Sequence, residues 1–173
     1  MAETEPTRTA AKPRPVLGLR RRPGSLALAV LRMPLRAARS GHLPGRTFVS
    51  FTHVGRRTGR SYDTVAMVLR HDDPNREVVV CAAWGPATDW VRNLRLAPAR
   101  EVRLGAERYV PEHRFLSEDE ALLVLSQFLW AHPVRIRVFR AVLGWDDLRD
   151  PEAARGFVAT HPFVAFRPAA RAA

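Results

Sequence analysis

The sequence predicts an α+β fold, with strands in the middle of the chain and helices after them. Three observations predict it: two β-rich segments flank a glycine- and arginine-rich loop at 55–60, a continuous apolar run occupies residues 78–83, and a capping box at residue 117 opens a helical stretch. The 173 residues suit one domain with a core of its own. We therefore expect a single domain over residues 25–173, preceded by a tail.

The N-terminal part of the chain divides into two segments. Residues 1–24 are rich in Pro, Ala, Thr and Arg and contain few large apolar side chains, so we expect a disordered basic tail. Residues 25–40 place leucines and arginines at helical spacing, which predicts a basic amphipathic helix that is kinked or restarted at Pro34. We favour packing of this helix against its own domain; the alternative is peripheral contact with an anionic membrane.

Neither segment has the pattern of a membrane span or of a secretory signal. The apolar run at 26–31 is far too short to cross a bilayer, and no small-residue cleavage site follows it. The single cysteine, Cys81, excludes an internal disulfide framework, and its apolar neighbours predict a buried structural thiol. We expect a cytoplasmic protein, with any membrane contact at the inner face.

A loop with three arginines and two glycines lies between two predicted strands, at 48–51 and 62–69. It reads Gly55-Arg56-Arg57-Thr58-Gly59-Arg60. The glycines permit backbone angles that side chains forbid, which would leave amide N–H groups free to face a ligand, and the planar arginine fork matches phosphate or carboxylate oxygens. The sequence therefore predicts an anion site on a hairpin turn. A solvated hairpin tip without a ligand is the alternative.

The later strands have their own signals. The apolar run at 78–83 is typical of a buried strand. Residues 101–104 and 108–115 form a second hairpin around a glycine turn, and Pro111 places the second of these strands at an edge or a bulge. Residues 161–167 give a closing strand.

Helix signals dominate the C-terminal third of the chain. Ser117 and Glu120 form a capping box ahead of a helix at 121–130. Pro133 marks the start of a second helix, which we expect to end before Gly144. Asp150-Pro151-Glu152 marks the start of a third helix.

A second motif directly follows the buried strand and reads Trp84-Gly85-Pro86-Ala87-Thr88-Asp89-Trp90-Val91-Arg92-Asn93-Leu94. This order of strand, glycine loop and helix start predicts a helix capped by Thr88 or Asp89, whose first-turn N–H groups favour an anionic or electron-rich ligand. Asp89 and Asn93 fall on one face of that helix. Trp90 falls with Leu94, and we favour a core position for it over a cofactor contact.

The charge balance indicates an anionic partner without identifying it. Lys and Arg total 28 against 17 Asp and Glu, which gives a net charge of +11. A phosphorylated or polycarboxylate cofactor, an acidic membrane and nucleic acid all satisfy this charge. Because the sequence has no helix-turn-helix pattern and no aromatic residues interleaved with the basic ones, we expect no nucleic-acid partner.

Several catalytic chemistries lack their sequence patterns here. Six scattered histidines and one cysteine predict no metal site. The chain has no Gly-x-Ser-x-Gly elbow, no complete P-loop and no Gly-x-Gly-x-x-Gly after a strand, which argues against a hydrolase or a conventional dinucleotide enzyme. A basic protein that binds membrane or nucleic acid without catalysis stays as an alternative.

The order of the two motifs resembles the deazaflavin-dependent nitroreductase family. The resemblance runs from about residue 31 to residue 168 and is best at 52–60 and 89–94. Members of that family adopt a split β-barrel, similar to the FMN-binding split barrels, with flanking helices. They use reduced coenzyme F420, a 5-deazaflavin with an anionic phosphate and oligoglutamate tail. The resemblance implies an F420H2-dependent oxidoreductase that transfers a hydride to a small electrophilic organic substrate, and the anionic tail accounts for the arginines.

Carried over by position, the resemblance implies three groups of cofactor-binding residues. The phosphate side is held by Arg56, Arg57, Thr58 and Arg60. Where the family commonly has a basic residue after the second glycine, this chain has Arg60, Ser61 and Tyr62 in succession, and each is a candidate. The strand segment Cys81, Ala82, Ala83 and Trp84 borders the deazaflavin ring, mainly through backbone groups. The residues that close over the ring are Asp89, Trp90 and Asn93.

The resemblance leaves the substrate and the proton donor open. Residues 132–135 lack the substrate-facing tyrosine that some relatives place there, which weighs against nitroreductase activity toward the family's known substrates. Tyr62 is the candidate catalytic proton donor, with His132 or a water as alternatives, and we favour a packed strand aromatic over a catalytic role for it. A related split barrel that uses FMN is the alternative to F420. Split barrels often pair, so a homodimer is a further expectation.

Overall fold

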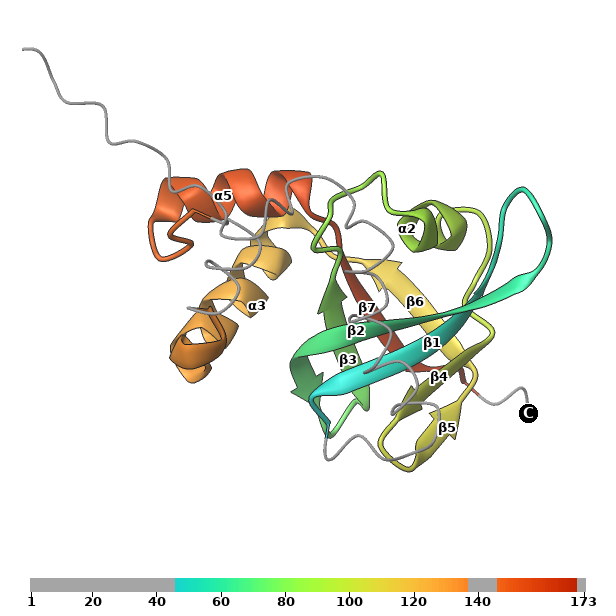
Figure 1. Ribbon diagram of the computed structural model, residues 1–173. Helices are drawn as coiled ribbons and strands as arrows, with labels where there is room; N and C mark the ends of the chain where they lie inside the picture. The colour runs from blue at the N-terminus through green and yellow to red at the C-terminus, as the bar shows by residue number, and fades with distance from the viewer. Residues whose placement is uncertain (1–45, 137–145, 171–173) are drawn as a thin grey trace, which may run out of the picture.

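The computed structural model describes residues 46–136 and 146–170 (Figure 1). The strands are β1 (Phe48–Val54), β2 (Ser61–Asp72), β3 (Glu77–Cys81), β4 (Glu101–Leu104), β5 (Glu107–Tyr109), β6 (Pro111–Phe115) and β7 (Phe163–Pro168). The helices are α2 (Asp89–Leu94), α3 (Glu118–Ala131) and α5 (Pro151–Thr160). The tail predicted at 1–24 and the helix predicted at 25–40 lie outside the described residues. Residues 133–136 are helical, and the rest of the helix predicted from Pro133 also lies outside them.

The seven strands form one antiparallel sheet in the order β5-β4-β1-β2-β3-β7-β6. Its two outermost strands, β5 and β6, follow each other in the chain with only Val110 between them. The sheet must therefore curl until its ends meet, and the Ala169 N–H bonds the Val110 carbonyl at 2.9 Å near that corner. The result is a nearly closed barrel with helices beside it, which confirms the predicted split β-barrel of the α+β class.

The β1–β2 hairpin carries the arginine-rich loop, as predicted. Its register pairs Val54 with Ser61 and His53 with Tyr62, so residues 55–60 connect the two strands directly. β2 is twelve residues long and pairs first with β1 and then with β3, with a shift in register between Val68 and Arg70. This long strand links the two halves of the barrel.

The hairpin predicted at 101–115 is more complex than the sequence indicates. Residues 108–115 were expected to form one strand, and the structure divides them at Val110 into β5, which pairs with β4, and β6, which pairs with β7. Pro111 begins β6 because its ring nitrogen has no hydrogen to donate to a ladder. The predicted edge position of Pro111 is confirmed, and the single long strand is wrong.

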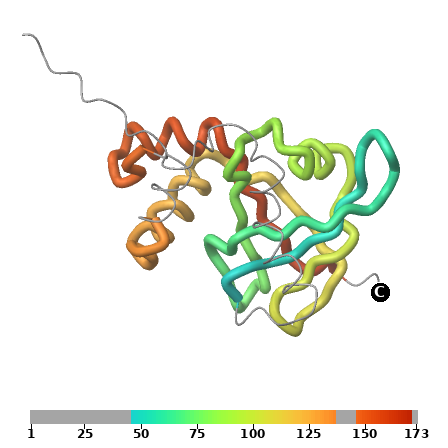
Figure 2. The backbone as a smooth tube through the Cα atoms, viewed as in Figure 1, coloured from blue at the N-terminus to red at the C-terminus, as the bar shows by residue number. Residues whose placement is uncertain are grey.

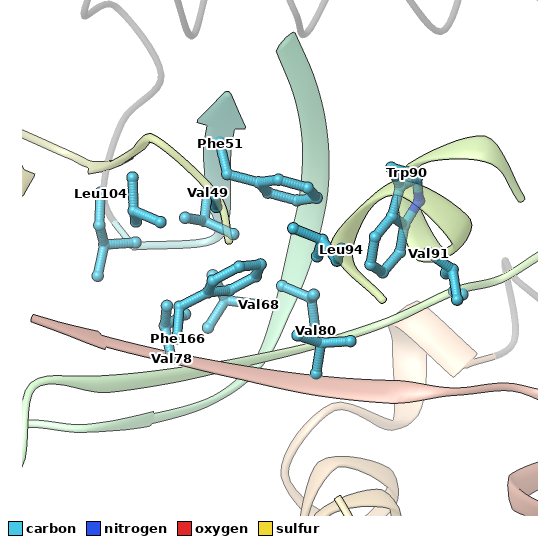
Figure 3. Close-up of a cluster of buried hydrophobic side chains, with 14 residues drawn as sticks. Val49, Phe51, Val68, Val78, Val80, Trp90, Val91, Leu94, Leu104 and Phe166 are labelled. Carbon is cyan, nitrogen blue, oxygen red and sulfur yellow. The ribbon is translucent and has the colours of Figure 1, made fainter. Parts of the chain in front are cut away.

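Two apolar cores lie on the two faces of the sheet. One fills the barrel (Figure 3). In it the Phe51 ring packs edge-on against Trp90, with ring centroids 5.3 Å apart, and is tilted against Phe166, with centroids 4.9 Å apart. The other lies between the sheet and helices α3 and α5, which pack against each other (Figure 1). β2, β3 and β7 supply side chains to both cores in alternation, whereas β1 and β4 supply side chains to the barrel core alone.

The ends of the long helices follow the predicted capping chemistry. Ser117 accepts from the Glu120 N–H and the Glu120 carboxylate accepts from the Ser117 N–H, which completes the capping box of α3. Asp150 accepts from the Ala153 N–H at 2.8 Å at the start of α5. Within the described residues, none of the helices has the length and apolar character needed to cross a bilayer.

The barrel core gives a direct test of this packing. Phe51 is 1% exposed, so we expect Phe51→Ala to lower the free energy of unfolding by about 3 to 5 kcal/mol through lost burial and a residual cavity. The matched control is Leu96→Ala, a residue that is 73% exposed and should change it by less than about 0.5 kcal/mol. Urea denaturation measures both, and equal effects of the two substitutions would contradict the core position of Phe51.

Candidate functional site

Two of the segments implied by the resemblance, residues 55–60 and helix α2, lie together at the end of the barrel where the β1–β2 hairpin meets α2 (Figures 1 and 2). Arg56 makes the connection, since its Nη1 and Nη2 both donate to Asp89 Oδ1, at 3.1 and 3.2 Å. Its backbone N–H and its Nη1 also donate to Asn93 Oδ1, at 3.1 and 3.2 Å. The arginine loop, residues 55–60, and α2 therefore form one unit, although Arg56 and Asp89 are 33 positions apart in the chain.

The arginine loop is held by its own backbone. The Gly55 N–H bonds the Arg60 carbonyl at 2.8 Å, and the Gly55 carbonyl accepts from the N–H groups of Thr58 and Gly59. Gly59 has φ of 66°, a left-handed conformation that glycine adopts without a Cβ clash. The predicted hairpin turn is confirmed.

The expectation that the loop amides are free for a ligand is wrong for most of them. The amides of Gly55, Thr58 and Gly59 bond carbonyls within the loop, that of Arg60 bonds Thr58 Oγ1 at 3.3 Å, and that of Arg56 bonds Asn93. The turn closes on itself because its glycine carbonyl accepts two of these bonds. Anion binding by this loop must therefore come mainly from side chains.

The three arginines of the loop have different environments. The Arg56 side chain is only 18% exposed and already lies against Asp89, so it ties the loop to the helix. Arg57 and Arg60 are exposed, and within the described part of the chain their guanidinium groups have no hydrogen bond or ion pair. Arg100, outside the loop, adds another guanidinium beside it, because its Nη1 donates to Ser61 Oγ at 3.0 Å. The site therefore presents positive charge that the described carboxylates do not neutralise.

Tyr62 backs the arginine loop from β2. Its hydroxyl lies 3.1 Å from Thr58 Oγ1, and a Cβ built on Gly55 would come within 2.5 Å of its ring. The ring also stacks on that of His53, with centroids 6.1 Å apart and planes inclined by 24°. The favoured interpretation of a packed aromatic agrees with these contacts, and its catalytic role stays a prediction.

His53 is a site residue that sequence reasoning missed. It is 4% exposed, its Nδ1 lies 2.9 Å from Asn93 Nδ2, and its Nε2 lies 3.1 Å from Thr64 Oγ1. Burial lowers the pKa of the imidazole below its usual value and outweighs the opposing effect of Asp63 and Asp89. One signal was available, because strand alternation places His53 on the same inward face as Val49 and Phe51.

The segment after β3 combines buried and exposed side chains. Cys81 packs on the helix side of the sheet, and burial raises the pKa of its thiol, which confirms the predicted structural thiol. Ala82 is buried in the barrel core, and its N–H donates to the Pro162 carbonyl at 2.9 Å. Ala83 is half-buried, whereas Trp84 is 42% exposed at the start of the turn.

Helix α2 is short and its start differs from the prediction. Thr88 occupies the N-cap position, but its hydroxyl donates backward to the Gly85 carbonyl at 2.8 Å and caps no helical N–H. The glycine turn brings that carbonyl within reach, so the hydroxyl stabilises the turn instead. Trp90 and Leu94 face the core, which confirms the favoured interpretation of Trp90, and Asp89 and Asn93 face the arginine loop. Contact of the Trp90 edge with a cofactor stays a prediction.

Comparison with known families decides what kind of protein this is. The sequence profile of the F420H(2)-dependent quinone reductase family matches residues 31–138, which is more than half of the chain and includes both motifs. The chain belongs to this family. It is therefore an F420H2-dependent reductase with coenzyme F420 as its cofactor, and the resemblance noted in the sequence is confirmed.

Solved structures with a similar shape share little sequence with this chain. An F420-H2 dependent reductase, FDR-A, is 18% identical, with a TM-score of 0.49 over 73% of this chain and 98% of that one. A conserved hypothetical protein from Mycobacterium tuberculosis is 17% identical, with a TM-score of 0.44 over 80% of each chain. An FMN binding protein from Nostoc punctiforme, related to pyridoxamine 5'-phosphate oxidase, is 13% identical, with a TM-score of 0.39 over 81% and 78%. No protein with a curated description matches the chain.

The donor set of the site fits coenzyme F420. Arg57 and Arg60 offer planar forks for phosphate or carboxylate oxygens, and neither has a carboxylate partner among the described residues. Among the described residues, no group of three or more His, Cys, Asp or Glu side chains is placed to hold a metal ion. The two guanidinium groups suit an anionic organic cofactor.

The packing of the arginine loop can be tested at Gly55. A methyl group there would lie 2.5 Å from a Tyr62 ring carbon and 2.7 Å from Thr58 Oγ1, so we expect Gly55→Ala to cost about 1 to 3 kcal/mol of stability. Gly156→Ala is the matched control, since a Cβ there meets nothing within 4 Å and α5 should gain about 0.5 to 1 kcal/mol. Thermal unfolding of both variants measures the difference. A Gly55→Ala protein as stable as the parent would contradict the close contact.

Proposed function

We propose that this reductase binds the anionic groups of coenzyme F420 on the arginine loop and reduces a small quinone-type substrate. The observation that carries the proposal is the pair Arg57 and Arg60, two exposed guanidinium groups without a carboxylate partner in the described residues, on a loop that is fixed to the barrel. The family to which the chain belongs supports the substrate class.

Each side chain of the loop has a separate task in this proposal. Arg57 and Arg60 bind phosphate or carboxylate oxygens of the cofactor, with Arg100 and Ser61 beside them. Arg56 acts indirectly, since its bonds to Asp89 and Asn93 hold the loop in place. A fixed loop pays less ordering entropy on binding than a loose one would.

The ring of the cofactor would lie along residues 81–84. The side chains of Cys81 and Ala82 are committed to the two cores, so this segment would meet the ring with backbone atoms and with the exposed indole of Trp84. Asp89 and Asn93 would border the other side through their connection to the arginine loop. These positions follow from the resemblance.

The chemistry divides between the cofactor and the protein. When bound, the reduced deazaflavin supplies a hydride, and a quinone that takes this hydride and one proton becomes a hydroquinone. The protein must hold the substrate, exclude water and provide the proton. Tyr62 is the candidate for the last task, because the residue is 44% exposed and its hydroxyl lies 3.1 Å from Thr58 Oγ1 in the arginine loop.

Three expectations outside the site stay proposals. They are the single domain over 25–173, contact of the N-terminal segment with an anionic membrane, and a homodimer. Sedimentation with anionic vesicles, using the full chain and a chain that lacks residues 1–40, tests membrane contact. Light scattering on the purified protein tests the dimer.

Arg57 is the decisive position for cofactor binding. We expect Arg57→Ala to weaken F420 binding by about 1.5 to 3 kcal/mol, or about 10- to 150-fold in Kd, because it removes a charge-assisted hydrogen bond. Fluorescence titration of F420 measures the Kd. The fold should be unaffected, since Arg57 has no hydrogen bond or ion pair in the described part of the chain.

The matched control for this experiment is Arg155→Ala. Arg155 is an exposed arginine on α5, so its loss changes the net charge equally and leaves the arginine loop intact. We expect the control to retain the parental Kd. Equal weakening in both variants would indicate a general charge effect and would remove Arg57 from the proposed site.

Tyr62→Phe separates a proton donor from a packed aromatic. The variant keeps the ring that stacks on His53 and lies against Gly55, and it loses only the hydroxyl. If the hydroxyl delivers the proton, kcat with a water-soluble quinone should fall about 100-fold or more while the Kd for F420 stays within about threefold. Turnover at the parental rate would assign Tyr62 to packing alone.

The substrate class has its own test with the unmodified enzyme. Reduced F420 should be reoxidised when a water-soluble benzoquinone or naphthoquinone is added, with one hydroquinone formed for each cofactor molecule oxidised. A protein that binds F420 tightly and reduces no quinone would overturn the substrate class and leave the cofactor site standing.

A further inference from the structure

We propose that His53 is a positioning residue for cofactor binding, and that it acts only as a neutral imidazole. In this form it fixes the side-chain amide of Asn93 and, through it, the arginine loop at 55–60. The inference rests on the proposed function of that loop. It adds a residue that touches neither the cofactor nor the substrate but sets the geometry of those that do.

The orientation of Asn93 follows from its neighbours. Its Oδ1 lies 3.1 Å from the Arg56 backbone nitrogen and 3.2 Å from Arg56 Nη1, and both of these atoms can only donate. The oxygen must therefore face Arg56. The amide nitrogen then faces His53, at 2.9 Å from Nδ1, and it can only donate there.

The orientation of Asn93 fixes the protonation state of His53. Because the Asn93 amide donates to Nδ1, that nitrogen must be unprotonated and accept. In a neutral ring the proton is then on Nε2, which donates to Thr64 Oγ1 at 3.1 Å. The hydrogen bonds thus run in a single direction, from Arg56 through Asn93 and His53 to Thr64.

A second proton on the His53 ring is incompatible with these hydrogen bonds. It would set an Nδ1–H against the N–H2 group of Asn93, so that two donors face each other in a pocket where both residues are about 4% exposed. A flip of the Asn93 amide would not help, because its N–H2 group would then face the two donors of Arg56 instead of the donor on His53. Protonation must break the connection at one end or the other.

The charged groups around the imidazole have opposing effects. Asp63 on β2 and Asp89 on α2 favour the protonated form, while burial disfavours it and has the larger effect, so the pKa lies below the usual histidine value. Arg56 lies beyond Asn93 and adds positive charge on that side. Tyr62 covers one face of the ring. His53 is therefore neutral near pH 7 and becomes charged only in acid.

Two substitutions distinguish the hydrogen-bond acceptor from the ring that carries it. His53→Asn places a carbonyl oxygen close to the position of Nδ1, so it keeps an acceptor for Asn93 but cannot gain a proton. His53→Leu removes the acceptor and leaves the Asn93 amide without a partner. His71→Asn is the matched control, because it also replaces a strand histidine by asparagine. His71 lies near the end of β2 that is remote from the arginine loop.

The first measurement needs no cofactor. Nitrogen NMR of the histidine rings in the unliganded protein should show His53 at neutral pH with Nδ1 unprotonated and Nε2 protonated. The side-chain amide signal of Asn93 should shift as His53 is protonated in acid and should not shift in His53→Asn. A ring with its proton on Nδ1 at neutral pH would overturn the inference whether or not F420 binds.

The second measurement is the Kd for F420 between about pH 7.5 and pH 5.5. We expect the Kd of the parental protein and of His71→Asn to rise about two- to fivefold more than that of His53→Asn toward the acid end, because a pKa below the usual histidine value leaves His53 only partly protonated at about pH 5.5. His53→Leu should bind about tenfold more weakly at pH 7.5. Acid effects on the cofactor itself are common to all four proteins, so the comparison removes them.

The outcomes separate this inference from the proposed function. Acid weakening as large in His53→Asn as in the parental protein, or a His53→Leu protein that folds and binds like the parent, would overturn the role of His53. Failure of the parental protein to bind F420 at any pH would instead overturn the proposed role of the arginine loop. The NMR result would then still decide whether His53 controls the position of Asn93.

Discussion

The side-chain amide of Asn93 is the contact on which the site depends. Its oxygen accepts from the backbone and the guanidinium of Arg56, and its nitrogen lies 2.9 Å from a buried ring nitrogen of His53. One amide thereby joins β1, the arginine loop and α2, which are up to 40 residues apart in the chain. An amide can do this because it has an acceptor and a donor on opposite sides, and a buried site requires both to be used.

The barrel explains why these groups meet. Phe51 packs against Trp90, which holds α2 against the barrel core (Figure 3). His53 lies two residues after Phe51 on the same inward face of β1. Asn93 lies about one turn after Trp90 on α2, beside His53. The polar contact is thus a continuation of the apolar core, and the stability of the core fixes the polar geometry.

The different environments of the three loop arginines follow from the same arrangement. Arg56 is next to α2 and is used to hold the loop, whereas Arg57 and Arg60 project into solvent, where an anionic group can reach them. Membership of the F420H(2)-dependent quinone reductase family supplies the anionic cofactor. Since the deazaflavin carries the hydride chemistry, the task of the protein is to provide geometry and charge, and this is the role proposed for the fixed loop.

The sequence by itself determined the features that depend on neighbouring residues. These are the hairpin around Gly55 and Gly59, the capping box at Ser117 and most strands of the barrel, together with the motif pair that resembles the F420-dependent family. Tertiary structure decided which loop arginine is paired, where His53 finds its partner, and that Val110 divides one expected strand in two. Those outcomes join residues far apart in the chain, and local propensity contains no information on which distant donor meets which acceptor once the sheet has curled.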